Sequence, residues 1–167
     1  MIRGPVQTEV ISMKELEIVE ADLSNKNHAE AILMLTDQYA QDPMGLGDPL
    51  PEETRKDLIR EMKNFPTTLC FIAFVDGNPA GVANCFYSFS TFHASRVLNI
   101  HDLAVSPSYR SKGIGEMLLA AAEKKASEGG CCRVTLEVRE DNRARNLYER
   151  LGFSYGDPTM YFMTKTL

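Results

Sequence analysis

The chain has 167 residues, of which 44% are hydrophobic and 25% are charged, and its formal net charge is −5. These values are typical of a single globular domain with a sizeable core, and the negative balance argues against a nucleic-acid partner. No apolar run approaches the ~20 residues of a membrane span, and no basic region precedes an apolar stretch at the N-terminus, so we expect a cytoplasmic protein with no signal peptide and no membrane partner.

The charge is unevenly distributed along the chain. Residues 1–66 carry a net charge of −6, whereas residues 67–167 carry +1. An acidic N-terminal part would attract a cationic substrate such as an amine. The alternative is that these carboxylates form a solvated surface, which charge alone favours.

The first part of the sequence is typical of one strand followed by two helices. Ser24 and Asn25 are both candidate N-caps for the first helix, and Phe65-Pro66 ends the second. A segment rich in Pro, Gly and Asp predicts a loop between them. The expected elements are a tail over residues 1–13, a domain over 14–167, a strand over Leu16–Ala21, a helix from Ser24 or Asn25 to about Tyr39, a loop over Gln41–Pro51 and a helix over about Glu52–Lys63.

Three strands are expected next. The stretches Thr68–Val75 and Ala80–Phe89 are separated by Asp76-Gly77-Asn78-Pro79, which is a hairpin turn signal. Residues 90–96 connect them to a largely buried strand over Leu98–Val105. Pro107 ends this strand because it offers no backbone donor.

A basic loop containing glycine follows this strand and leads into a long helix. The loop is Arg110-Ser111-Lys112-Gly113-Ile114-Gly115, and apolar residues recur at helical spacing from Ile114 until Gly129-Gly130. The first turn of a helix has unpaired N–H groups and a partial positive charge, and glycine lets a ligand approach the main chain. The junction therefore predicts a phosphate or pyrophosphate site, with a plain loop-to-helix joint as the alternative.

Two common phosphate motifs do not fit this loop. A P-loop requires Lys and then Ser or Thr after its second glycine, but Gly115 is followed by Glu116. A dinucleotide fingerprint requires a third glycine, where this chain has Leu118.

The pattern Arg110-x-x-Gly113-x-Gly115, after a strand that ends Leu-Ala-Val-x-Pro, resembles the acetyl-CoA-binding motif of the GNAT N-acetyltransferases. The similarity continues through a strand over Val134–Val138 and a helix in the segment Asn142-x-x-Ala-x-x-Leu-Tyr148-Glu-x-Leu-Gly-Phe153. The resemblance implies an α/β (α+β) fold with a mixed, mostly antiparallel sheet of six to seven strands, splayed between strands 4 and 5 and flanked by about four helices.

The same resemblance implies a closing strand over Met160–Lys165, with Phe153–Tyr155 as a candidate hairpin partner. Because members of the family often dimerise, this strand is also a candidate for holding a homodimer together.

The implied reaction is acetyl transfer from acetyl-CoA, a cosubstrate, to a primary amine, with no metal. The pyrophosphate would bind the basic loop, and the amides of the pantetheine arm would pair with main-chain atoms at Leu103 and Val105 in the gap of the sheet. The residues assigned to the coenzyme are Leu103, Ala104, Val105, Arg110, Ser111, Lys112, Gly113, Ile114, Gly115, Glu116, Asn142 and Tyr148.

Tyr148 is the expected proton donor to the leaving thiolate, because the tyrosine at this position of the family commonly faces the coenzyme sulfur. A plain core position is its alternative. His101 and Asp102 are the candidate bases, and a regular strand would point them to opposite faces unless a β-bulge alters the alternation. Glu137, acting through water, is another candidate. The Leu103 amide is expected to stabilise the thioester oxygen.

The acceptor is expected to be a small cationic amine, with a peptide N-terminus or a lysine as the alternative. Each candidate residue for this site has a structural alternative as a loop, cap or core residue. A non-catalytic acetyl-CoA-binding module and a nucleotide-binding domain are the competing functions. The residues assigned to the acceptor are Asp37, Tyr39, Asp42, Tyr87 and Phe89.

The four cysteines show no Cys-x-x-Cys spacing, so a zinc site or a redox motif is not expected. We interpret Cys70, Cys85, Cys131 and Cys132 as reduced residues that act as small hydrophobes.

Overall fold

The computed structural model describes residues 15–166, in which five strands form one mixed sheet in the order β1-β2-β3-β4-β5. The tail predicted over residues 1–13 lies outside the described residues. No helix in the described part of the chain is both long and apolar enough to cross a membrane. The elements are β1 (Leu16–Glu20), α1 (Lys26–Ala40), α2 (Glu52–Asn64), β2 (Thr68–Val75), β3 (Asn78–Ser90), β4 (Ser95–Val105), a 3₁₀ turn (Pro107–Tyr109), α3 (Ile114–Glu128), β5 (Arg133–Leu136) and α4 (Arg145–Arg150).

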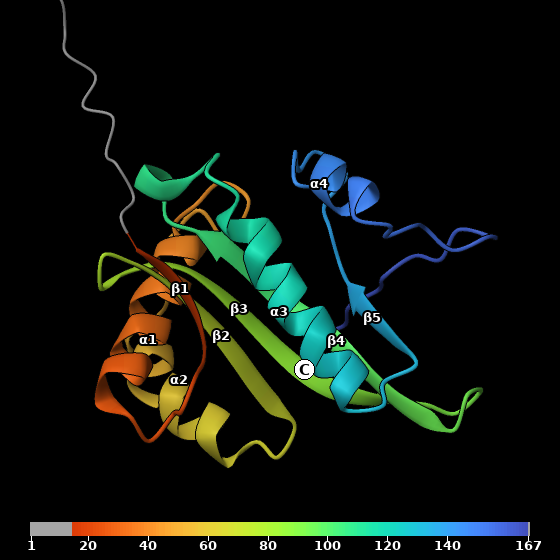
Figure 1. The fold of residues 1–167 in the computed structure, drawn as a ribbon, viewed down its shortest axis with the longest axis horizontal. Helices are drawn as coiled ribbons and strands as arrows, with labels where there is room; N and C mark the ends of the chain where they lie inside the picture. The colour runs from red at the N-terminus through yellow and green to blue at the C-terminus, as the bar shows by residue number, and fades with distance from the viewer. Residues whose placement is uncertain (1–14, 167) are drawn as a thin grey trace, which may run out of the picture.

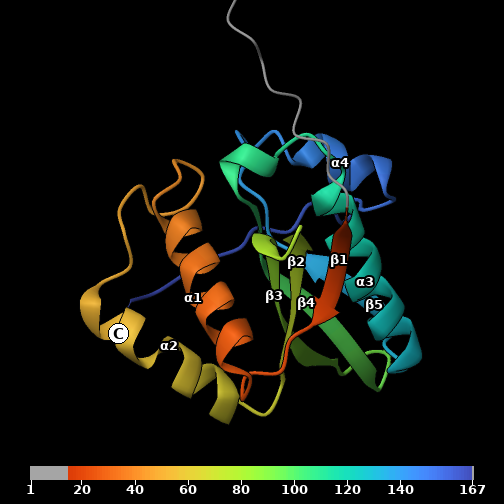
Figure 2. The same ribbon diagram turned by 60° about the vertical axis from the view of Figure 1, so that its left-hand side comes forward.

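Helices cover both faces of this sheet. This explains why residues 69–75 of β2 are all apolar. Successive side chains of a strand point to opposite faces. Leu69 and Phe71 therefore join the core beneath α3, whereas Cys70 and Ile72 pack with α1 and α2. Figure 2 shows α3 on one face and α1 with α2 on the other. A strand that is buried on both faces consists mainly of apolar residues.

The helix signals in the sequence act as expected. Asn25, rather than Ser24, caps α1: its Oδ1 accepts from the backbone N–H groups of Asn27 at 2.9 Å and His28 at 3.4 Å. Helix α3 buries residues at helical spacing, among them Ile114, Leu118 and Leu119, so that one face covers the sheet.

The central strand β4 is irregular on both of its edges. On the β3 side, Asn84 pairs with Asp102 and Cys85 pairs with Ile100, so His101 is an extra residue on β4. On the other side, β5 runs parallel to β4, and its pairing ends where Ile100 lies opposite Leu136. Figure 1 shows β5 turning away from β4 towards α4 beyond this point. The expected splay of the sheet is therefore present, and residues 101–105 have no β5 partner.

The prediction of a closing strand is wrong. In the described part of the chain, neither Met160–Lys165 nor Phe153–Tyr155 is in a strand, and the sheet has five strands instead of six to seven. The side chains of Met160, Tyr161, Phe162 and Met163 are exposed. An apolar, aromatic composition makes a strand only where a backbone edge pairs with it, and β5 offers an edge of four residues.

Candidate active site

A cleft of about 500 Å³ opens where β4 and β5 diverge. One wall is the unpaired end of β4, including Leu103, Ala104 and Val105, and the opposite wall is the segment from Leu136 to Tyr148. Helix α1 and the loop after it close a third side with Tyr39 and Asp42. Segments that are far apart in the sequence therefore enclose this space.

Only part of the basic loop lines this cleft. Arg110 and Gly115 line the cleft, whereas the Ile114 side chain is buried in the core. The Lys112 ammonium lies 5.4 Å from the centroid of the Tyr109 ring. Gly113 precedes α3 with φ +80°, and Ser111 also has a positive φ of 60°. These two left-handed residues turn the chain so that the first amides of α3 begin beside the cleft.

Gly115 lies between the two walls, with room for a Cβ. A Cβ built on it would lie 3.6 Å from Leu147 Cδ2 and 3.8 Å from Val105 Cγ2. Glu116, one residue further, has its carboxylate 3.1 Å from Arg150 Nη2. Of these two residues, Gly115 lines the cleft and Glu116 does not.

The charge of Arg110 is already paired. Its Nη2 donates to Asp42 Oδ2 at 2.7 Å and its Nε donates to the Val105 carbonyl at 3.0 Å. The backbone N–H of Met44 and the Arg110 guanidinium lower the pKa of Asp42. Asp42, which we expected to grip the acceptor, pairs with a cation of the predicted phosphate loop. The exposed Arg143, which the sequence pattern did not single out, also lines the cleft.

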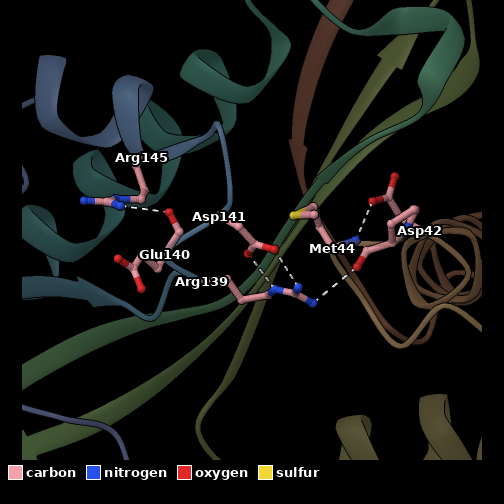
Figure 3. Close-up of polar contacts among 7 residues, drawn as sticks. Asp42, Met44, Arg139, Glu140, Asp141 and Arg145 are labelled. Carbon is pink, nitrogen blue, oxygen red and sulfur yellow. Dashed lines mark hydrogen bonds and ion pairs between the residues drawn. The ribbon is translucent and has the colours of Figure 1, made fainter.

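A second contact crosses the cleft from the segment after β5. Arg139 Nη1 donates to the Pro43 carbonyl at 3.2 Å, while the same guanidinium pairs with Asp141 at 2.8 Å. Figure 3 shows this guanidinium between Asp141 and the loop that carries Asp42 and Met44. Residues 42–44 are thus tied to both walls of the cleft.

Tyr148 lies on α4 and is buried, with its ring edge-on to Phe153 at a centroid distance of 6.0 Å. It lines the cleft. Burial, with a smaller contribution from Tyr39, raises the pKa of Tyr148 to about 12. Tyr39 also lines this cleft, and burial followed by the charge of Asp102 raises its pKa. Both phenols therefore keep their protons at neutral pH. Asn142 is beside them, and its Oδ1 accepts from the Ala144 N–H at 2.9 Å.

The bulge in β4 changes where His101 and Asp102 point. Asp102 Oδ2 accepts from Asn84 Nδ2 at 3.1 Å, and this amide also donates to Thr36 of α1. The His101 ring lies edge-on to Phe86 at 5.7 Å. Both side chains are thus on the side of the sheet that α1 and α2 cover, which the alternation of a regular strand would not allow.

A second hollow of about 740 Å³ lies beside α2 and shares His101 and Glu137 with the cleft. The aromatic residues that line it include Phe65 and Phe86. The carboxylate of Glu137 accepts from Asn99 Nδ2 at 3.2 and 3.3 Å. The two hollows therefore meet at the splay of the sheet.

Three residues assigned to the acceptor lie elsewhere or point elsewhere. Asp37 is buried, accepts from the Leu50 N–H at 2.9 Å and pairs with Arg55 at 3.4 Å, so it holds α1, the loop and α2 together. Phe89 is 63% exposed and lines neither hollow. Tyr87 borders the second hollow, but its ring packs with the core beneath α3.

Sequence reasoning missed most of the wall of the second hollow. The sequence marks Phe65 only as a helix-ending residue, and Phe86 and Asn99 only as strand residues. No local signal marks them, because they come together only when α2, β3 and β4 are packed.

The four cysteines differ in burial: Cys70 and Cys85 are buried, Cys131 is half-buried and Cys132 is exposed. Burial raises the pKa of Cys70 to about 12 and that of Cys85 further. Within residues 15–166, no group of three or more His, Cys, Asp or Glu side chains is placed to hold a metal ion.

The comparison with protein families agrees with this geometry. The model of the acetyltransferase (GNAT) family matches residues 32–153. The chain therefore belongs to the GNAT acetyltransferase family. A curated relative from Bacillus subtilis (strain 168), the uncharacterized N-acetyltransferase YhfO, is 36% identical over 87 residues. That match covers 52% of this chain and 58% of the relative, so the chain aligns with less than two thirds of it.

Solved structures share the fold. A probable acetyltransferase superposes with a TM-score of 0.78 and 24% identity, covering 90% of this chain and 98% of that one. The aminoglycoside N-acetyltransferase AAC(6')-Iy, in complex with CoA, superposes with a TM-score of 0.72 and 20% identity, covering 91% and 96%. A ribosomal-protein-alanine N-acetyltransferase from Brucella melitensis biovar Abortus 2308 superposes with a TM-score of 0.71 and 20% identity, covering 90% of this chain and 100% of that one.

Proposed function

We propose that this protein transfers the acetyl group of acetyl-CoA to the nitrogen of a small primary amine. The observation that carries the proposal is the meeting of the two hollows at His101 and Glu137, in the gap between β4 and β5. A thioester that enters from one side can reach an amine that enters from the other. The fold class alone does not require this arrangement.

The coenzyme would lie along the cleft. The first amides of α3, at Ile114, Gly115 and Glu116, would bind the pyrophosphate, and Arg143 would add a positive charge. The pantetheine amides would pair with residues 103–105 of β4, which β5 leaves unpaired. The amide of Leu103 would donate to the thioester oxygen as negative charge develops there.

His101 would take a proton from the substrate ammonium, because it lines both hollows. The nitrogen then forms a bond to the acetyl carbon, and the carbon–sulfur bond breaks with its electron pair on sulfur. Tyr148, which is protonated at neutral pH, would donate to that sulfur. The nitrogen loses two protons in all, one of which replaces the proton of Tyr148, so each turnover releases one proton. Asp102 is less suited as the base because the Asn84 amide holds it.

The test is an assay of thiol release from acetyl-CoA against a panel of small amines and short peptides, together with a calorimetric titration of acetyl-CoA. The proposal expects binding of acetyl-CoA and release of thiol in step with the acetylated amine. Absence of affinity for acetyl-CoA would overturn it. Turnover on peptides alone would replace the small amine by a peptide N-terminus or a lysine, and binding without turnover on any acceptor would indicate a non-catalytic module.

A further inference from the structure

The second hollow has one aromatic wall. Phe65 follows the last turn of α2, and its ring packs edge-on against Phe86 of β3 with centroids 5.6 Å apart. Phe86 in turn packs against His101 at 5.7 Å. A continuous aromatic row therefore leads from the rim of the hollow to the candidate base. Phe65 is 54% exposed, so it leaves an apolar surface for a ligand to cover.

The lining of this hollow carries a single carboxylate without an arginine or lysine partner among the described residues. No lysine or arginine lines this hollow in the part of the chain that the structure describes, and its two carboxylates are Glu61 and Glu137. Glu61 is already paired with its neighbour Arg60 at 2.9 Å. Glu137 has only the neutral Asn99 amide on its oxygens, and Asn99 also lies 3.3 Å from Thr135 Oγ1. This amide holds the carboxylate at the junction of the hollows.

Of the other carboxylates near α1, Asp102 is held by the neutral Asn84 amide and lines neither hollow, and two more are paired with arginines. Asp37 is buried and paired with Arg55, and Asp42 is paired with Arg110 in the coenzyme cleft. A substrate with several positive charges would thus bring more charge than this hollow can match. The acidic balance of the N-terminal part does not translate into an acidic acceptor site.

We infer that the acceptor is a primary monoamine with a flat apolar body, such as an arylalkylamine. Its ring would lie against Phe65 and Phe86, and its ammonium would lie at Glu137 beside His101. This inference rests on the proposed acetyl transfer. Acetylation turns the cation into a neutral amide, so the ion pair with Glu137 is lost and the product is released more easily than the substrate.

The test compares 2-phenylethylamine and tryptamine with spermidine and kanamycin as acceptors. We expect kcat/KM to be at least about tenfold higher for the two arylalkylamines, since one aromatic contact of this kind corresponds to roughly that factor. Higher kcat/KM for spermidine or kanamycin would overturn the inference while leaving the acetyl transfer intact. Preference for a peptide with an N-terminal phenylalanine would overturn the assignment of a monoamine acceptor and support the contact with the aromatic wall.

Two variants test the walls separately. Phe65→Ala and Glu137→Gln are each expected to raise KM for 2-phenylethylamine by about tenfold, with the dissociation constant of acetyl-CoA unchanged. The matched control is Phe89→Ala, because Phe89 is an exposed aromatic residue that lines neither hollow, and it should change neither value. Thermal unfolding followed by circular dichroism confirms that each variant is folded. An unchanged KM in folded Phe65→Ala would overturn the aromatic contact.

The inferred arylalkylamine site can also be tested if the protein shows no acetyl transfer. In that case the proposed function fails, and binding of 2-phenylethylamine is measured by ligand-observed NMR on the full chain. Binding that Phe65→Ala abolishes would keep the hollow as an arylalkylamine site. Absence of binding would overturn that as well.

Discussion

The two sides of the splay are built in opposite ways. The pyrophosphate site proposed on the cleft side is a short contiguous segment, in which Arg110, Gly113 and Gly115 lie within six positions. The proposed acceptor side is assembled from α2, β3, β4 and β5, and its aromatic row joins residues 65, 86 and 101. A pyrophosphate is recognised by backbone amides that any chain can present at a helix start, whereas a substrate body requires side chains from several elements. Substitutions on one side should therefore change the affinity for one substrate and leave the affinity for the other unchanged.

The largest effect is expected at Tyr148, the proposed proton donor to the leaving sulfur. Tyr148→Phe keeps the edge-on packing with Phe153 but removes the hydroxyl, so kcat should fall by about 100-fold with acetyl-CoA affinity unchanged. Thiol release under saturating substrates measures this. Tyr155→Phe, at an exposed tyrosine outside both hollows, is the control. Full activity in Tyr148→Phe would place the proton donor elsewhere.

The pH dependence of kcat follows from the same residue. Burial raises the pKa of Tyr148 to about 12, and the phenol acts as an acid only while it is protonated. Its contribution is therefore complete at neutral pH and is lost only as the pH rises towards about 12. We expect no loss of kcat from this group between pH 7 and pH 10, which a profile at saturating amine would check. A wild-type loss in that range that disappears in Tyr148→Phe would contradict the assignment.

The two glycines of the loop should separate binding from stability. A Cβ at Gly115 meets only ordinary contacts, so Gly115→Ala should fold normally and weaken acetyl-CoA binding by about tenfold. Gly113 has a positive φ, and Gly113→Ala should lower the free energy of unfolding by about 1–2 kcal/mol. Calorimetric titration and urea unfolding measure the two quantities. Undiminished affinity in Gly115→Ala would contradict backbone recognition at this site.

Releasing Arg110 should strengthen coenzyme binding. Asp42→Asn removes a negative charge beside the predicted pyrophosphate position and frees the guanidinium, so acetyl-CoA affinity should rise by about fivefold. Because the pKa of Asp42 is lowered, its charge is present at all pH values above the usual carboxyl range and is lost only at lower pH. The gain in acetyl-CoA affinity should therefore be the same at pH 6 and pH 8, and it should be smaller at high salt. Asp48→Asn, at an exposed carboxylate that lines neither hollow, is the control. Weaker binding in Asp42→Asn would mean that the ion pair positions Arg110 for the phosphate.

The smallest effect is expected at the acceptor wall. Asn99→Ala removes the amide that holds Glu137, so KM for the amine should rise by about threefold while acetyl-CoA affinity stays constant. Steady-state kinetics with each substrate varied in turn would measure this. A change in acetyl-CoA affinity would show that the two sides are not independent.

Local patterns predicted much of this molecule. The strand Thr68–Val75 has the expected bounds, Asn25 is one of the two expected caps, and the β-bulge at His101 follows the possibility raised from the resemblance. The prediction of a closing strand was wrong because an exposed segment without strand pairing can have the same composition as a strand. Asp37 and Phe89 were expected at the acceptor, but neither the partners of a carboxylate nor the face of an aromatic residue can be told from its neighbours in sequence.

The sequence by itself determined the order of most elements, the membership in the GNAT family and the position of the glycine loop at the start of α3. The elements and the loop depend on local patterns that act over a few residues, and the family is indicated by the resemblance of two short motifs to those of its members. Only the tertiary structure decided that Asp42 neutralises Arg110, that Phe65 and Phe86 line one hollow, and that Glu137 lacks a cationic partner within residues 15–166. The physical reason is that charge pairing and burial depend on distances in space between residues that are far apart in the chain.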